Sequence, residues 1–83
     1  MKAWEATYKG HTIRIEQRVL TRKLFIDGAL HAENSGLGTE TRLFARIGRG
    51  KGWGEPVTAY LRGFLPESCS LVINETNVDV TPT

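Results

Sequence analysis

The chain has 83 residues, of which 40% are hydrophobic and 24% charged, so it is one small globular domain and not a disordered segment. Its net charge of +2 is unevenly spread: all 11 lysines and arginines lie in residues 1–62, and residues 63–83 carry three acids and no base. No apolar run is long enough to span a membrane, and the polar N-terminus has no signal-peptide pattern. We therefore expect a cytoplasmic protein without a membrane partner, and the single cysteine agrees with that compartment.

The first part of the chain predicts two hairpins. Apolar and polar residues alternate over 4–8 and again from Ile13, with a tight-turn signal at Lys9-Gly10 between them. A polar connection over residues 17–22 follows.

The second hairpin runs over residues 23–32 and turns at Asp27-Gly28. A two-residue loop would place Phe25 opposite Leu30 and Leu24 opposite His31. A three-residue loop, with Gly28 in the left-handed conformation, would place Leu24 opposite Leu30 instead. The sequence leaves this register open, and a slip of one residue exchanges the buried and exposed faces.

The later part of the chain predicts three more strands. Residues 34–38 have the composition of a loop, and alternation over 41–47 predicts a strand with Leu43, Ala45 and Ile47 on one face. A further strand opens at Pro56 and buries Val57, Ala59 and Leu61. After a turn over residues 63–68, residues 69–73 form the last strand that the pattern predicts.

These elements predict an all-β fold, a small antiparallel β-sandwich or meander of about seven strands. The domain is expected to cover residues 1–75. Residues 76–83 are polar, and we expect them to form a flexible C-terminal tail.

Four segments resemble, in the order of their strands and turns, a single repeat of the Fas apoptotic inhibitory molecule family: Gly10–Ile15, Leu24–Gly28, Phe44–Gly48 and Leu71–Asn74. The chain differs from that family in holding one unit where two are usual, and in its glycine-rich loop. The resemblance implies a small antiparallel β-sandwich with a non-enzymatic role in protein binding or in protection against aggregation. It implies no catalytic residues.

The most unusual segment is residues 48–54, which carry a glycine at every second position around Trp53. A phosphate-binding loop would need a following helix, and here a strand follows, so we interpret the segment as a flexible hairpin loop. Trp53 either anchors a partner or folds back over one end of the sandwich, and the sequence does not decide between the two.

Basic and aromatic side chains gather on the hairpin that contains this loop. Such a face can contact proteins, or can hold single-stranded nucleic acid through phosphate contacts and base stacking. The candidate binding residues are Arg42, Phe44, Arg46, Arg49, Lys51, Trp53, Tyr60 and Arg62.

We find no pattern for catalysis, a metal or a cofactor. His11, His31 and Cys69 are far apart and follow no metal-ligand spacing. We expect each histidine to be a satisfied polar neighbour, and Cys69 to be a small core residue because it shares the parity of Leu71. The acids are scattered, and Asp27 has a role in its turn.

The sequence therefore predicts a non-enzymatic protein-binding domain. Its partner would be another protein, or another copy that pairs with an exposed strand edge. Single-stranded nucleic-acid binding through the Arg-rich face of residues 42–62 is one alternative. A role as an accessory subunit of an enzyme is another.

Overall fold

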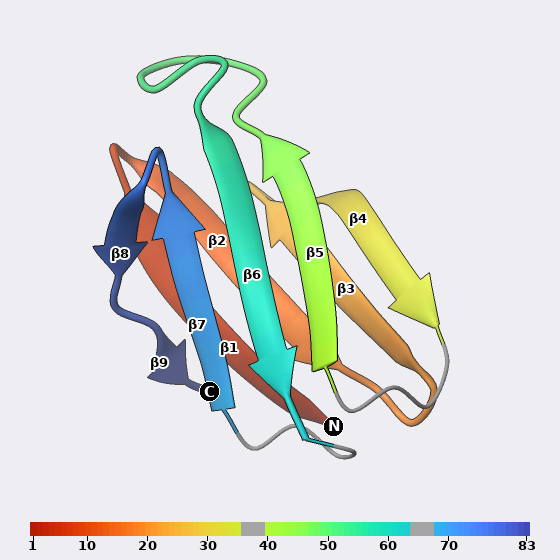
Figure 1. The fold of residues 1–83 in the computed structure, drawn as a ribbon. Coiled ribbons are helices and arrows are strands. Elements are labelled where there is room, and N and C mark those ends of the chain that lie inside the picture. Colours follow the sequence, from red (N-terminus) through yellow and green to blue (C-terminus); the bar gives the residue numbers. More distant parts are fainter. Residues whose placement is uncertain (36–39, 64–67) are drawn as a thin grey trace.

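The computed structural model describes residues 1–35, 40–63 and 68–83, which form two antiparallel sheets packed face to face (Figure 1). These residues contain no helix, and hence none that is long and apolar enough to cross a membrane. The strands are β1 (Lys2–Tyr8), β2 (His11–Gln17), β3 (Thr21–Ile26), β4 (Ala29–Ser35), β5 (Glu40–Arg46), β6 (Pro56–Arg62), β7 (Ser68–Ile73), β8 (Thr76–Val78) and β9 (Thr81–Pro82).

Each sheet is largely a meander. One sheet has the order β4-β3-β2-β1-β9, and the other has the order β5-β6-β7-β8 and lies in front of it in Figure 1. The chain changes sheet between β4 and β5 on one side of the sandwich, and between β8 and β9 on the other. The predicted all-β antiparallel fold is confirmed, with nine strands in the described residues where about seven were expected.

The core follows from the alternation seen in the sequence, because successive side chains of a strand point to opposite faces. The predicted inward positions are buried except Cys69, which is half-buried, and both sheets supply them. The buried cluster contains Trp4, Ala6, Ile13, Ile15, Leu24, Ile26, Leu43, Ala45, Ile47, Val57, Ala59, Leu61, Leu71 and Ile73.

The expected polar connection over residues 17–22 is shorter than predicted. Gln17 ends β2 and Thr21 begins β3, so only residues 18–20 join the two strands. Arg22 is buried inside β3, and its Nε donates a hydrogen bond to Oε1 of Gln17 at 2.9 Å. The prediction was wrong at this point because Gln17 and Arg22 are polar although they are buried, so the alternation of apolar and polar residues does not reveal these strand ends.

The open register of the second hairpin is resolved in favour of a two-residue turn. Phe25 pairs with Leu30 beside the turn, and Asp27 (φ 52°) and Gly28 (φ 83°) both adopt positive φ, as a tight hairpin turn requires. One residue further on, Leu24 pairs with Ala32 and not with His31. His31 is the extra residue of a β-bulge, so neither register considered from the sequence holds along the whole hairpin.

The C-terminal residues do not form the expected tail. β8 pairs with β7, and β9 pairs with β1 at the opposite end of the sequence. The amide of Thr83 donates to the carbonyl of Ala3 at 2.9 Å, and Val78 and Val80 pack against the core. Pairing between the two ends of the chain is a long-range contact that local composition does not reveal.

Two predicted loops lie partly outside the described residues. Asn34 and Ser35, expected in a loop, belong to β4, and residues 36–39 are not described. The predicted turn over 63–68 is described only at Gly63 and at Ser68, and Ser68 begins β7.

The core makes a direct prediction about stability. Ile15 is fully buried, so Ile15→Ala removes packed methyl groups and leaves a cavity; it should lower the free energy of unfolding by about 2–5 kcal/mol. Urea denaturation measures this change. Val19→Ala is the control because Val19 is 84% exposed, and an equal loss in both variants would contradict the observed core.

Candidate functional site

The outward surface of β5 and β6 holds most of the residues that the sequence singled out, and we call it the hairpin face. The two strands pair in regular antiparallel register, with Arg42 directly opposite Tyr60 and Phe44 opposite Thr58. The alternate residues of both strands point into the core. The hairpin face consists of Arg42, Phe44, Arg46, Thr58, Tyr60 and Arg62.

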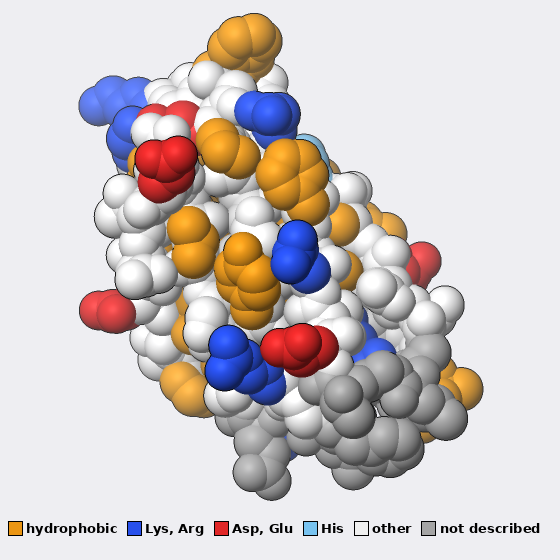
Figure 2. All heavy atoms as spheres, in the orientation of Figure 1, with side chains coloured by type: hydrophobic (Ala, Val, Ile, Leu, Met, Phe, Trp, Pro, Cys, Tyr) orange, Lys and Arg blue, Asp and Glu red, His pale blue; other side chains and the backbone are white. Residues whose placement is uncertain are grey.

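Arginine and aromatic side chains on this face are in contact with one another. The guanidinium carbon of Arg42 lies 5.6 Å from the centroid of the Tyr60 ring, and that of Arg46 lies 5.6 Å from the centroid of Phe44. Both distances fit cation–π contacts. Phe44 is nevertheless 51% exposed, and Figure 2 shows hydrophobic and basic side chains mixed over the front sheet. The face therefore offers flat apolar surface and positive charge side by side.

The glycine-rich loop that tops this hairpin is tied down by its own backbone. The amide of Gly54 donates to the carbonyl of Ile47 at 2.7 Å, and that of Glu55 donates to the carbonyl of Gly52 at 2.9 Å. Gly52 has φ +78°, and a Cβ atom there would lie 2.8 Å from Oε2 of Glu55 and 3.3 Å from Cδ1 of Ile47. The loop is thus closely packed at Gly52, a contact that only glycine permits without rearrangement.

A buried histidine fixes the loop to the opposite sheet. His11, the first residue of β2, places Nδ1 2.6 Å from Oδ2 of Asp27 and Nε2 2.7 Å from the carbonyl oxygen of Lys51. A carboxylate and a carbonyl can only accept hydrogen bonds, so both ring nitrogens of His11 have to donate, which makes the ring an imidazolium. His11 thereby joins the β3–β4 turn to the glycine-rich loop.

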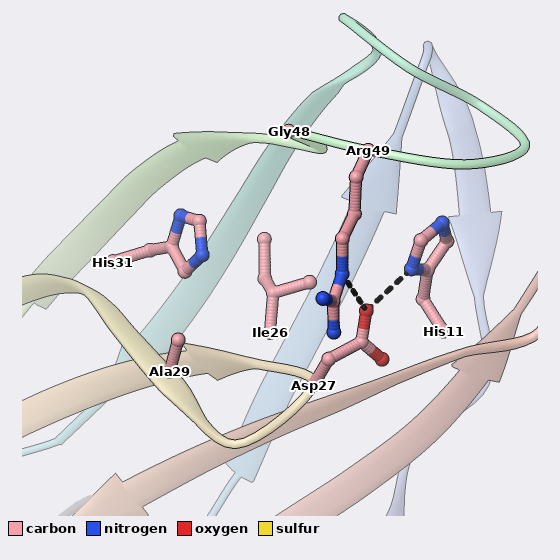
Figure 3. A pocket seen from close by; sticks show the side chains of 7 residues that line it. All are labelled: His11, Ile26, Asp27, Ala29, His31, Gly48 and Arg49. Carbon is pink, nitrogen blue, oxygen red and sulfur yellow. Dashed lines mark hydrogen bonds and ion pairs between the residues drawn. The ribbon is translucent and has the colours of Figure 1, made fainter.

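The electrostatics of this contact agree with its geometry. The hydrogen bond to Asp27, followed by that to the Lys51 carbonyl, raises the pKa of His11 above its usual value. The same bond, together with a 3.0 Å hydrogen bond from the Thr12 amide to Oδ1, lowers the pKa of Asp27. Figure 3 shows Asp27 between His11 and Arg49, whose Nε lies 4.0 Å from Oδ2 of Asp27. The carboxylate therefore sits between two cations.

Two further contacts hold the loop from its sides. Nζ of Lys9 lies 2.7 Å from Oε1 of Glu55, and this ammonium lowers the pKa of the Glu55 carboxyl. Nη1 of Arg46 donates to the carbonyl of Gly54 at 2.9 Å while its guanidinium lies over Phe44. The loop, expected to be a flexible connection, is therefore anchored at several points.

Trp53 is the one large apolar side chain of this loop, and it points away from the protein. It is 74% exposed and does not cover an end of the sandwich, which resolves the question left open by the sequence. Its exposure contrasts with the packing of the backbone that carries it. The loop thus presents an aromatic ring to solvent from a well-supported position.

Of the remaining candidates, Arg62 belongs to the hairpin face, whereas Arg49 and Lys51 lie in the loop and do not join it. The side chains of Arg49 and Lys51 are exposed, but Lys51 contributes to the site through its carbonyl, and Arg49 lines a cavity of about 300 Å³ with His11 and His31. Arg62 lies 3.9 Å from Glu40, so part of its charge is balanced. The role of His11 as an anchor was missed, because its partners lie 16 and 40 residues away in the sequence.

Cys69 is half-buried against the core, and desolvation raises the pKa of its thiol to about 11. The thiol is therefore protonated at neutral pH and is a poor nucleophile. Within residues 1–35, 40–63 and 68–83, no three His, Cys, Asp or Glu side chains gather in a way that could hold a metal ion.

No protein-family model, curated protein or solved structure matches the chain. The resemblance to the Fas apoptotic inhibitory molecule repeat stays a prediction. Function has to be inferred from the hairpin face and the anchored loop.

The His11 contact predicts a stability that depends on pH. Because the folded-state pKa of His11 is raised, its contribution is complete below the unfolded value of about 6.5 and is lost as the pH rises through the folded value. Because the pKa of Asp27 is lowered, the carboxylate's contribution is complete above its unfolded value and is lost as the pH falls through the folded one.

Urea denaturation of the wild type from pH 5 to 9 should show the loss at the alkaline side, and His11→Gln should remove it. His31→Gln is the matched control and should keep the wild-type profile. A folded-state pKa of His11 at or below that of a free histidine, measured by NMR, would contradict the imidazolium.

Proposed function

We propose that this protein is a non-catalytic protein-interaction domain, and that Trp53 and the hairpin face form its contact surface. The observation that carries the proposal is the exposed Trp53 on a loop whose backbone is anchored by His11, Arg46 and its own hydrogen bonds. The exposed side chain of Trp53 makes no contribution to the core, so its position is not explained by folding. An exposed aromatic ring on a restrained backbone is suited to anchor a partner.

The composition of the surface supports the same function. Tryptophan, tyrosine and arginine are the residues most enriched among those that dominate the energy of protein interfaces. Here Trp53, Tyr60 and Arg42 belong to one hairpin. Because that hairpin is supported from below by the core, a partner would meet a surface that needs little ordering upon binding.

Trp53→Ala should therefore weaken binding of the partner protein by at least about tenfold, since a central anchor residue contributes roughly 2 kcal/mol or more. The melting temperature should hardly change, because the ring is outside the core. The immobilised domain would be exposed to a cell extract, and the retained proteins compared by mass spectrometry.

Val19→Ser is the matched control: Val19 is as exposed as Trp53 but lies in the β2–β3 connection. Proteins retained by the wild type and by Val19→Ser, but lost with folded Trp53→Ala, support the proposal. Unchanged retention by folded Trp53→Ala would refute the assigned surface, and unfolding of that variant would show that Trp53 is structural.

A second candidate function is binding of single-stranded nucleic acid. It is favoured by the Arg42–Tyr60 and Arg46–Phe44 contacts, which would give a base a stacking platform beside a phosphate-binding charge. Such binding would weaken steeply with salt, because phosphate contacts release counterions.

Titration with a mixed pool of single-stranded oligonucleotides distinguishes this second function. If it is correct, amide signals of residues 42–62 shift at physiological salt, and the double variant Arg46→Glu, Arg62→Glu abolishes the shifts. Binding that is unchanged in this variant would exclude the hairpin face as a nucleic-acid site.

A further inference from the structure

The four edge strands of the two sheets are protected to different degrees. β8 has three residues and β9 has two, and β4 is interrupted by the bulge at His31. Short length and bulges are ordinary devices that stop an edge from pairing with another chain. β5 has seven residues, contains no proline, and pairs with β6 in unbroken register. Among the four edge strands described, β5 therefore combines full length with regular pairing.

The sheet that ends in β5 is also the smaller one. It has four strands against five in its partner sheet, and in Figure 1 β4 projects beyond β5 on the open side of the sandwich. The side chains of β4 that share the inward face with Ile26 and Leu24 are poorly covered: Ala29 is exposed and Ala32 is half-buried. A strand added beside β5 would occupy the missing fifth position and would cover them.

The charge pattern of β5 indicates which strand would fit. Glu40, Arg42, Phe44 and Arg46 occupy successive outward positions. Opposite charges on directly facing residues stabilise a strand pair, and like charges destabilise it. A second copy paired antiparallel about Phe44 would set Arg42 against Arg46 twice, which disfavours that register. A copy paired about Leu43 would set Glu40 against Arg46 but would leave Arg42 opposite Phe44. A segment with acidic residues at both facing positions would satisfy both arginines.

We propose that β5 binds an extended acidic segment of a partner protein by adding it as a fifth strand to the smaller sheet. Acidic side chains of the segment lie opposite Arg42 and Arg46, and small apolar side chains between them face Ala29 and Ala32. The inference rests on the proposed protein-binding function and adds the chemistry of the partner. Main-chain hydrogen bonds to β5 provide affinity, and the alternate side chains provide specificity.

A designed peptide tests this mode of binding. The probe carries the core Glu-Val-Thr-Val-Glu between capped serine flanks, so that both glutamates face Arg42 and Arg46 in either strand direction. Addition of the peptide should shift the amide signals of Glu40–Arg46 and should slow hydrogen exchange of the outward-pointing amides of β5. The affinity should fall as salt is raised, because the charges are exposed.

Changes to the peptide separate backbone pairing from simple charge attraction. Methylation of its backbone amides removes the hydrogen-bond donors and should weaken binding by at least about tenfold, while the charges are unchanged. Replacement of both glutamates by lysine should weaken it by a similar factor or more. These tests need no protein variant and so do not depend on whether a variant folds.

A charge exchange completes the design. The double variant Arg42→Glu, Arg46→Glu should lose the glutamate peptide and bind the lysine peptide, whereas Lys2→Glu, on β1 of the other sheet, should behave as the wild type. Recovery by the exchanged pair is expected only if the facing residues are in contact.

The inference would be overturned if the peptide did not bind, if the methylated peptide bound equally well, or if the amide shifts were confined to sheet β4-β3-β2-β1-β9. It would also be overturned if the protein formed a dimer through β5 without peptide, or if oligonucleotides and not the peptide slowed hydrogen exchange in β5. The proposed function can fail separately. If cellular proteins are retained through Trp53 while β5 shows no protection, only the added strand is refuted.

Discussion

The arrangement of the hairpin depends on the two hydrogen bonds of His11. The ring lies between the sheets at the end of the molecule that carries the glycine-rich loop, and it connects Asp27 of one sheet's turn to the Lys51 carbonyl of the other sheet's loop. Burial by itself would favour the neutral imidazole, since it penalises the charged form. The adjacent carboxylate outweighs that penalty, and Asp27 is in turn stabilised by the Thr12 amide. The buried imidazolium of His11 thus has a hydrogen-bond acceptor for each of its two N–H groups. The same bonds restrain the loop, which its glycine residues alone would not do.

The anchoring of the loop lowers the cost of ordering that Trp53 would incur when a partner binds. On a mobile loop, Trp53 would have to be ordered when a partner binds, and the lost freedom would reduce the affinity. Here the packing of Gly52 and the bonds of His11 and Arg46 have already restricted the backbone. Val19 is also exposed, and its connection is held as well, since the amide of Arg18 donates to the carbonyl of Thr21 at 2.8 Å. The two sites therefore differ in the side chain that they present, because a tryptophan ring offers a larger and more rigid contact area than a valine.

The sequence predicted those features that repeat with the period of a strand. The alternation over 41–47 and 56–62 was sufficient to assign the buried and outward faces of β5 and β6, and hence to group Arg42, Phe44 and Tyr60 on one surface. Features that depend on a single distant partner were missed: the His11–Lys51 bond, the buried Arg22, and the pairing of β9 with β1. The bulge at His31 belongs to the same class, because a tight turn fixes the register only next to itself. Local pattern therefore predicted the surface but not the contacts that hold its loop.

The two arginines of β5 bear on which strand could pair with this edge. An unbroken edge strand with an exposed Phe44 invites pairing with any other extended chain, including another copy. Arg42 and Arg46 flank that phenylalanine, so a copy paired about Phe44 would set arginine against arginine, while a copy paired about Leu43 would set only Glu40 against Arg46. The same two charges attract a strand that carries acids at alternate positions. Because the smaller sheet ends one strand short of β4, such a partner would also cover inward side chains that the domain by itself leaves exposed. The proposed selection of an acidic partner thus rests on one pair of residues on one open edge.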